Sequence, residues 1–297
     1  MDKIFLVQDK TIYYHSVEEV CQQLVCGRYF NLVIRKLCMK LKMGVPGFLI
    51  NPKVRNAKKI IMTDTACHIG SVKTCCRLVG RENVCLYFMN TIDERNEYML
   101  SLFDKKNIYT FDKGDAEKYE IHFLHTPFST KFPGYGEKVP AKYDVLFLGR
   151  EKGRGEEIRS IYDLCKENEL KSKFLVLGSD DSEMKIDSFL PYKEYLQLVQ
   201  ESKAIAEIVK KGQEGCSLRY MEALFYQKKL ITNNATVVSD QYYNPDNVFL
   251  IGKDDPKTLP DFLAKEYSHS ENETEMFRTL NLEQWLQNIW ENDASPQ

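Results

Sequence analysis

Short apolar runs typical of strands alternate along this chain with longer, amphipathic runs typical of helices. Strands that alternate with helices pair in parallel, because each helix carries the chain back to the starting edge of the sheet. The pattern therefore predicts an α/β protein with parallel sheets flanked by helices. In the first half we predict strands over residues 3–7, 59–62, 84–89 and 107–110, and helices over 17–26, 29–42, 71–79, 94–103 and 115–119.

A second series of the same kind follows residue 143, after a stretch with three prolines and two glycines that breaks the pattern. We predict strands over 144–149, 173–177, 204–208, 229–232 and 248–251, helices over 155–168, 191–201, 217–226 and 277–290, and a frayed end over 293–297.

Two series predict two doubly wound, Rossmann-like domains. We place an N-terminal domain at 1–140, a second domain at 141–270, and a C-terminal helical segment, 271–297, that packs back across the interface. Ligands of such sheets bind beyond the carboxyl ends of the strands, so we expect the site in a cleft between the domains.

Composition narrows the function classes. A chain of 297 residues with 43% hydrophobic content has enough apolar surface for two cores. The formal net charge of −2 argues against a nucleic-acid partner. Nine cysteines, an odd number without paired C-x-x-C motifs, favour free thiols in a reducing compartment. No run of about 18 apolar residues occurs, so we expect a cytoplasmic protein.

The sharpest motif runs from Glu214 to Leu224 and holds two glutamates eight positions apart, where a glycine-containing loop becomes a helix. Ser217 is a candidate N-cap, so we expect Glu214 in the loop and Glu222 in the second helical turn. The free N–H groups and positive end of such a helix favour phosphate. The two carboxylates are then placed to contact different parts of one extended ligand.

Three cations, Arg150, Lys152 and Arg154, follow a buried strand that ends at Gly149. Cations at the carboxyl end of a strand suit a diphosphate, which arginine binds in bidentate fashion. A solvated basic turn explains these three residues alone equally well, and the motif beginning at Glu214 in the same domain shifts the balance towards phosphate.

The second half contains, in this order, Gly149-Arg150, Lys152-Gly153, a strand that ends at Gly178, and the segment from Glu214 to Glu222 followed by Ala-Leu. In this set and order of features it resembles the donor-binding domain of GT-B glycosyltransferases. The resemblance is strongest to the retaining family-4-like group and to bacterial lipopolysaccharide and capsular polysaccharide transferases. It covers roughly residues 143–252.

The resemblance implies roles for individual residues. Arg150 and Lys152 would hold the diphosphate, with Arg154 as an alternative to Lys152, Glu214 would contact the donor sugar, and Glu222 the ribose. Backbone N–H groups of Cys216, Ser217 and Leu218 would contact the phosphates.

In the first half, Asp64 and His68 follow a strand, where catalytic groups would face a cleft. Asp64 equally fits an Asx turn or helix cap, and His68 a structural histidine, or else a base or a contact to phosphate or acceptor. The basic, apolar segment from Tyr29 to Lys42 suits either the core or an anionic membrane surface. We expect no essential metal or other cofactor, since cations and helix ends can neutralise the leaving group.

Three functions follow as hypotheses. The first is a retaining, metal-independent transfer of a hexosyl or related sugar from a nucleotide sugar to a hydroxyl of a surface glycan or lipid-linked glycan, at the inner face of the plasma membrane. The second is a nucleotide-sugar epimerase on the same fold. The third is a non-catalytic protein that binds sugar nucleotides.

Overall fold

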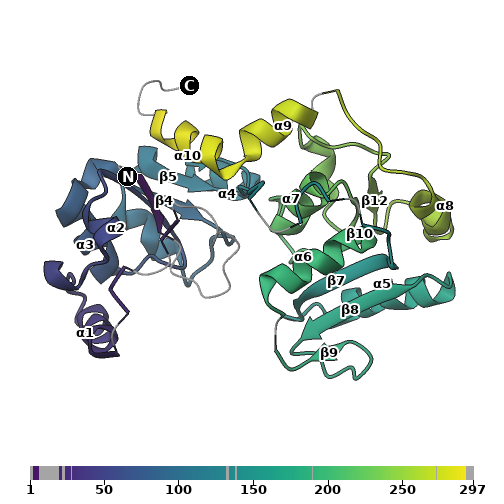
Figure 1. Cartoon of the computed structure of the whole chain (residues 1–297), viewed down its shortest axis with the longest axis horizontal. Helices are drawn as coiled ribbons and strands as arrows, with labels where there is room; N and C mark the ends of the chain where they lie inside the picture. Colours follow the sequence, from purple (N-terminus) through teal and green to yellow (C-terminus); the bar gives the residue numbers. More distant parts are fainter. Residues whose placement is uncertain are drawn as a thin grey trace. The chain divides into compact units, whose positions relative to one another are not determined.

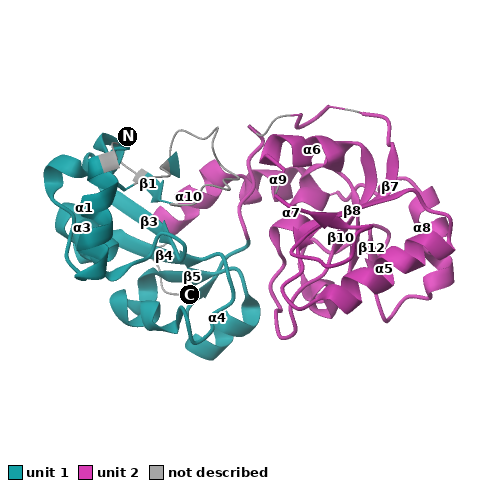
Figure 2. Cartoon of the chain, turned by 90° about the horizontal axis from the view of Figure 1, so that it is seen from below, with its two compact units in different colours: residues 1–125 teal, residues 126–297 magenta. Residues whose placement is uncertain are grey.

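The computed structural model describes residues 3–6, 20–21, 24–27, 29–131, 134–137, 139–188, 190–271 and 273–291. The chain divides into two compact units, residues 1–125 and 126–297, coloured separately in Figure 2. The division falls at the start of the predicted proline- and glycine-rich segment. Packing of the C-terminal segment across a domain interface stays a prediction, and residues 293–297, predicted to fray, lie outside the described residues.

In the first unit, every described strand pairing is parallel, as predicted. The buried runs Lys59–Thr63 and Val84–Phe88 form the middle of the sheet, where both faces are covered. The sheet has the order β2 (Val20–Cys21), β1 (Lys3–Leu6), β3 (Lys59–Thr63), β4 (Val84–Phe88), β5 (Ile108–Thr110) and β6 (His122–Phe123).

Helices of the first unit form where the apolar residues recur at helical spacing. Val72 and Cys75, one turn apart on α3, join Ile60 and Met62 of β3 in one core. The α-helices are α1 (Tyr29–Lys40), α2 (Pro52–Arg55), α3 (Ile69–Val79) and α4 (Lys113–Tyr119), and the 3₁₀ helices are η1 (Gly47–Leu49), η2 (Arg81–Asn83), η3 (Glu97–Leu102) and η4 (Lys105–Asn107).

Two predicted helices of the first half are wrong where the structure describes them. Within 17–26, Val20–Cys21 is a strand that pairs with β1, since a β-branched residue at a sheet edge gains more from pairing than from a helical turn. Within 94–103 the chain is the 3₁₀ helix η3. The Asn96 side chain bonds to the Asp93 N–H and the Thr91 carbonyl, and this turn delays the helix start to Glu97.

The second unit holds the second predicted parallel sheet, and all its described pairings are parallel. Its order is β12 (Val248–Leu250), β11 (Lys229–Thr232), β10 (Ser202–Glu207), β7 (Tyr143–Arg150), β8 (Ser172–Leu177) and β9 (Lys185–Ile186). From β7 the chain proceeds outwards to β8 and β9, then returns past β7 to β10 and continues outwards on the other side. The order of strands therefore reverses between β7 and β10.

Helices cover both faces of this sheet (Figures 1 and 2). On one face, α5 (Gly155–Glu167) and α8 (Leu259–Ala264) pack against alternate strand residues such as Phe147 and Ala206. The other face is covered by α6 (Tyr192–Gln200) and α7 (Leu218–Phe225), which contact β10. Short 3₁₀ helices, η5 (Ala235–Ser239) and η6 (Pro256–Thr258), complete this unit.

The predicted tail helix over 277–290 is two helices, α9 (Glu273–Leu280) and α10 (Leu282–Glu291). The break at Asn281 follows from backbone bonds with Phe128, whose N–H donates to the Leu280 carbonyl at 3.0 Å and whose carbonyl accepts from the Leu282 N–H at 2.6 Å. The buried apolar positions change phase at the break, because Leu280 and Leu282 are two residues apart and would lie about 160° apart on a continuous helix.

Gly70, in the first turn of α3, provides a test of the packing that holds α1 in place. A Cβ added at Gly70 would lie 2.5 Å from the Met43 carbonyl oxygen, whereas one added at Gly47 would meet nothing within 4 Å. We expect Gly70→Ala to destabilise the first unit by about 1–3 kcal/mol, and Gly47→Ala to change stability by less than about 0.5 kcal/mol. Urea unfolding of the two variants distinguishes these outcomes, and equal stabilities would contradict the close approach.

Candidate functional site

The topological switch point between β7 and β10 positions the candidate site of the second unit. The two strands pair directly, with Ala204 opposite Val145 and Ile205 opposite Leu146. The loops that leave their carboxyl ends diverge to opposite sides of the sheet, and open α/β sheets bind ligands outside the carboxyl ends of the strands at such a point. Both sequence motifs, the cations after Gly149 and the segment from Glu214, lie on these two loops.

The loop after β7 carries Arg150 and Lys152, whose side chains are exposed. Lys152 and Gly153 turn the chain sharply, with left-handed φ values of 48° and 75°. Arg154 is less exposed, and its guanidinium donates to the carbonyls of Arg150 at 2.5 Å, Glu151 at 3.2 Å and Ile208. Partial burial lowers the pKa of Arg154. Arg154 thus braces the β7 loop against the end of β10.

The loop after β10 contributes two further cations, Lys210 and Lys211, that the sequence analysis did not assign to the site. Because β7 and β10 are neighbours, these lysines and the pair Arg150 and Lys152 come from adjacent loops at one edge of the sheet. The sequence signal that could have identified them is their position directly after a buried strand. The two loops therefore gather five cations at one edge of the sheet, although the chain as a whole carries a formal charge of −2.

A buried carboxylate, Glu207, organises the β10 loop, and the sequence analysis missed it. It lies at the end of β10, 3% exposed, and accepts hydrogen bonds from the Ser217 N–H at 3.3 Å, the Ser217 hydroxyl and the Thr232 hydroxyl at 2.6 Å. Burial raises the pKa of Glu207 despite these bonds. An acid that ends an apolar strand is the signal that would have found it.

The start of α7 has the predicted form. Ser217 is the N-cap, and its hydroxyl accepts from the Arg219 N–H at 3.0 Å. Since the Ser217 N–H donates to Glu207, it is already engaged within the chain. The Leu218 N–H begins the helix and has no intrahelical acceptor, as at every helix start. Contact of these amides and of Cys216 with phosphate stays a prediction.

The two glutamates of the motif lie in the predicted places, Glu214 in the loop and Glu222 in the second turn of α7. Glu214 is exposed, and its backbone carbonyl accepts from the Thr236 hydroxyl at 2.6 Å. Glu222 is fully buried and accepts from the hydroxyls of Tyr192 at 2.9 Å and Tyr195 at 2.7 Å. The same spacing therefore yields one carboxylate in solvent and one in the core.

Arg219 completes the partners of Glu222. Its guanidinium bonds to Glu222 at 2.7 Å and to the Leu148 carbonyl of β7 at 3.2 Å, and it stacks on the Tyr195 ring at 4.3 Å. The network joins α6, α7 and β7. Contact of Glu222 with a ribose stays a prediction, and a ribose hydroxyl would have to take the place of one of these donors, for example Tyr192.

In the first unit, the order of strands reverses between β1 and β3, and Asp64 follows β3 at that point. One oxygen of Asp64 accepts from the N–H groups of Thr65 and Met89, and the other accepts from Asn90 at 2.8 Å. Burial raises the pKa of the Asp64 carboxyl. These bonds make Asp64 a brace between the loops after β3 and β4, and its catalytic role stays a prediction.

His68 is exposed and is the N-cap of α3, without a side-chain capping bond. Partial burial and the nearby charge of Arg35 lower the pKa of His68. The imidazole is therefore neutral at pH 7 and able to accept a proton. The structure thus leaves His68, rather than Asp64, as the more accessible group at this edge of the first sheet.

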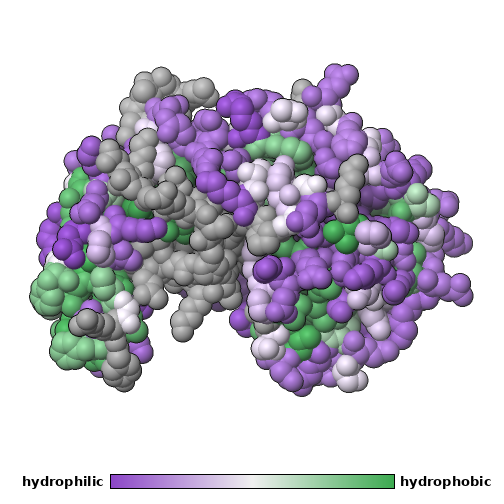
Figure 3. Space-filling model, in the orientation of Figure 1, coloured by the Kyte–Doolittle hydropathy of each residue, from purple (hydrophilic) through white to green (hydrophobic). Residues whose placement is uncertain are grey.

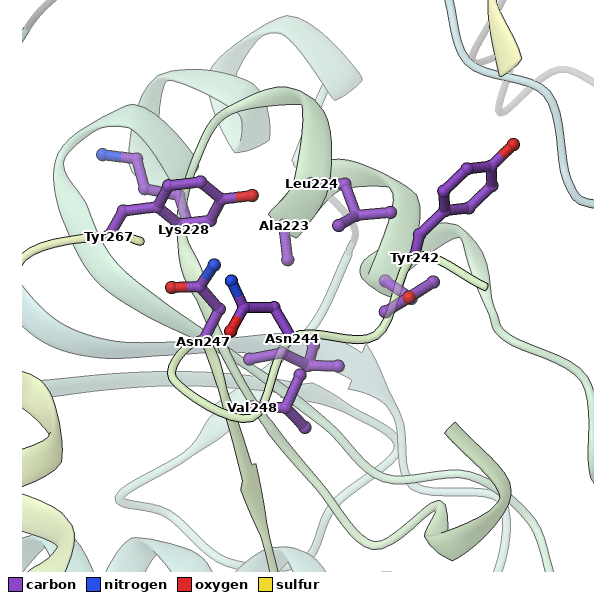
Figure 4. Close-up of a pocket in the computed structure, with 10 residues that line it drawn as sticks. Ala223, Leu224, Lys228, Tyr242, Asn244, Asn247, Val248 and Tyr267 are labelled. Carbon is purple, nitrogen blue, oxygen red and sulfur yellow. The ribbon is translucent and has the colours of Figure 1, made fainter. Parts of the chain in front are cut away.

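A small pocket of the second unit lies at the opposite end of the sheet from these loops (Figure 4). It is bounded by α7 and by Leu230 and Val248, near the amino ends of β11 and β12. Its polar side chains are engaged within the chain, for example Asn247, which donates to the Ser268 carbonyl at 2.7 Å. It is not the site that the motifs define.

In the part of the chain that the structure describes, no three His, Cys, Asp or Glu side chains are grouped to hold a metal ion. None of the helices described is long and apolar enough to cross a bilayer.

Comparison with known proteins identifies the fold. No family model and no curated protein matches this chain. Among solved structures, AviGT4, a glycosyltransferase involved in avilamycin A biosynthesis, is similar over 98% of this chain and 97% of its own, with a TM-score of 0.57 and 10% identity. T4 phage BGT, in complex with its UDP-glucose substrate, is similar over 99% of this chain and 96% of its own, with a TM-score of 0.48 and 12% identity.

UDP-GlcNAc 2-epimerase from Neisseria meningitidis is similar over 98% of this chain and 99% of its own, with a TM-score of 0.46 and 9% identity. At 10% identity, the similarity to AviGT4 is one of fold. The chain has a GT-B glycosyltransferase-like fold, an α/β structure with two Rossmann-like domains, as predicted.

The two motif glutamates differ in what their removal should cost. Glu222→Ala leaves Arg219 and two tyrosine hydroxyls without their buried acceptor, so we expect a loss of about 3–5 kcal/mol. The matched change Glu214→Ala, at an exposed position, should alter stability by less than about 0.5 kcal/mol. Thermal and urea unfolding measure both, and similar losses would contradict the assigned burial.

Glu207 predicts a pH dependence of stability. Because its pKa is raised above the ordinary value of 4.5, the folded chain holds this proton more tightly than the unfolded chain. Its contribution to the free energy of unfolding is highest below that value and declines as pH rises through the raised pKa. The free energy of unfolding of Glu207→Gln, relative to the natural protein, should therefore increase between pH 4.5 and pH 8. A constant difference would contradict a raised pKa.

Proposed function

We propose that the protein is a glycosyltransferase that moves a sugar from a nucleotide-sugar donor to a hydroxyl group of an acceptor. One observation carries this proposal: the switch point between β7 and β10, in a GT-B-like fold, gathers exposed cations beside the start of α7. AviGT4, which is similar in fold, is a glycosyltransferase.

The donor diphosphate would bind across the two adjacent loops. Arg150 and Lys152 on one loop, with Lys210 and Lys211 on the other, place positive charge where the leaving nucleoside diphosphate develops negative charge. Arg154 holds the loops together through main-chain carbonyls. We therefore assign the second phosphate contact to Lys152 rather than to Arg154. We also propose that the transfer is metal-independent, because the cations of the two loops supply the charge that compensates the leaving group.

The sugar would lie towards Glu214, whose carboxylate is exposed and whose backbone is held by Thr236. A carboxylate fixed in this way can accept hydrogen bonds from sugar hydroxyls. Retention of anomeric configuration follows only from the resemblance of the Glu214 to Glu222 motif to retaining enzymes. The nucleoside would extend towards α7, near Glu222.

The acceptor would be a hydroxyl of a surface glycan or of a lipid-linked glycan at the inner face of the plasma membrane. His68 is the group of the first unit best suited to contact it, because a neutral, exposed imidazole can accept a hydroxyl proton. Asp64, buried and bonded by three donors, would position the same edge.

Donor binding tests the proposal directly. We expect one of the UDP, GDP, CMP or dTDP sugars to raise the melting temperature of the protein, since a ligand that binds only the folded state stabilises it. Arg150→Ala and Lys152→Ala should each weaken that donor by about 10- to 100-fold, the value of one charge-assisted hydrogen bond. Lys106→Ala, an exposed lysine of the first unit, is the matched control and should leave affinity unchanged.

Product analysis by mass spectrometry and NMR separates the alternatives. Transfer to an acceptor, or slow hydrolysis of the donor, supports a transferase, and loss of both in Glu214→Gln with donor affinity retained supports the placement of Glu214. Conversion of the donor to its epimer without acceptor would instead establish an epimerase. Donor binding without turnover, unaltered by Glu214→Ala, would indicate a binding protein, and failure to bind any nucleotide sugar would refute the proposal.

A further inference from the structure

Large apolar side chains reach solvent mainly on one short segment of the first unit. Of the eight large hydrophobic residues that are exposed among those described, six lie between positions 30 and 48. Phe48 is 76% exposed and Phe30 is 70% exposed, values unusual for phenylalanine. The other four are Val33, Leu37, Leu41 and Met43.

The spacing of these residues places four of them on one side of α1. Phe30, Val33, Leu37 and Leu41 recur at intervals of three or four residues and form one stripe along the helix and its last turn. Figure 3 shows a hydrophobic patch over the region of α1. Such a contiguous patch on a chain surface marks a place of interaction.

The side of α1 that adjoins the stripe anchors the helix. Ile34 and Cys38 pack against the core of the first unit, and the close approach of Gly70 to the Met43 carbonyl fixes the turn that follows the helix. Ile34 and Cys38 therefore meet the expectation of a core-packing helix, whereas the four residues of the stripe face water together with the basic residues. One side of α1 packs against the core, and the apolar stripe beside it faces solvent.

The charge of this region selects the partner. Residues 20–63 contain nine of the chain's 41 lysines and arginines and none of its 43 acidic residues. Lys36 and Lys40 are exposed and border one side of the stripe on α1. Lys42 follows the stripe, and Lys73 donates to the Lys42 carbonyl at 3.0 Å. An apolar stripe bordered by lysines is complementary to a surface that is apolar inside and anionic outside.

We propose that this stripe docks onto an anionic lipid bilayer. The side chains of Phe30, Leu37 and Phe48 would enter the boundary between headgroups and acyl chains, and the lysines would contact lipid phosphates. A second copy of the chain fits less well, because a symmetric contact would bring two acid-free basic surfaces together. Docking at a bilayer would bring the protein to a lipid-linked acceptor, and only this last suggestion rests on the proposed function.

Vesicle co-sedimentation tests the proposal without any sugar transfer. The full chain should bind vesicles of phosphatidylcholine mixed with phosphatidylglycerol, bind vesicles of phosphatidylcholine alone at least tenfold more weakly, and be released in part by salt. Because the readout is binding, failure here leaves the donor-binding and transfer assays unaffected, and failure of those assays leaves this result standing.

Two double variants, each with a matched control, separate the apolar and ionic contributions. Phe30→Ser with Leu37→Ser should reduce vesicle binding at least tenfold, whereas Tyr98→Ser with Val238→Ser, at the two exposed apolar positions outside the patch among the described residues, should not. Lys36→Glu with Lys40→Glu should reduce binding about 25-fold or more, at about fivefold per lysine. The same charge change at Lys106 and Lys257 should have a small effect.

Circular dichroism and thermal unfolding verify that the four variants fold, which is expected because every altered side chain is exposed. The proposal is overturned if the natural protein does not bind the anionic vesicles, or if the patch variants bind as well as their controls. It is equally overturned if sedimentation shows a dimer that Phe30→Ser with Leu37→Ser dissociates, since the patch would then be an interface between copies.

Discussion

The parallel pairing of β7 with β10 is the contact on which the candidate site depends. Each strand continues to a different side of the sheet, so the loops after Arg150 and after Glu207 part at the same edge. The cations on these loops have like charge and repel, and hydrogen bonds to main-chain and hydroxyl groups hold the loops in place against that repulsion. Arg154 donates to carbonyls of both loops, and Glu207 holds the start of α7. A ligand with two phosphates would relieve the remaining repulsion.

Burial divides the two glutamates of the motif into different chemical roles. Glu222, in the core, has an arginine and two tyrosine hydroxyls as partners, because a buried carboxylate without such donors would be too costly to keep. Glu214 is exposed, and its backbone carbonyl accepts from the Thr236 hydroxyl, which supports the loop that carries its side chain. Rigid support beneath an exposed acid is the arrangement expected where a polar ligand binds.

The first unit shows a conflict between local pattern and burial in α1. Its sequence is that of an amphipathic helix, yet the outward side is the apolar one. Natural chains tolerate such conflicts where function requires them. The absence of acidic residues from positions 20–63 means that the conflict and the basic charge coincide in one region, and the proposed bilayer contact would account for both.

The sequence by itself determined the alternation of strands and helices, the two series, Ser217 as N-cap and the fold class, because periodicity and capping are local properties. From the sequence we predicted a helix over 17–26 and one continuous helix over 277–290. Pairing with β1 instead makes Val20–Cys21 a strand, and backbone bonds with Phe128 divide the tail helix at Asn281. Only the tertiary structure decided that Glu222 is buried and Glu214 exposed, that Glu207 and Lys210 join the site, and that α1 turns its apolar side outward. Those outcomes depend on which distant segments pack together, and a linear pattern does not contain that information.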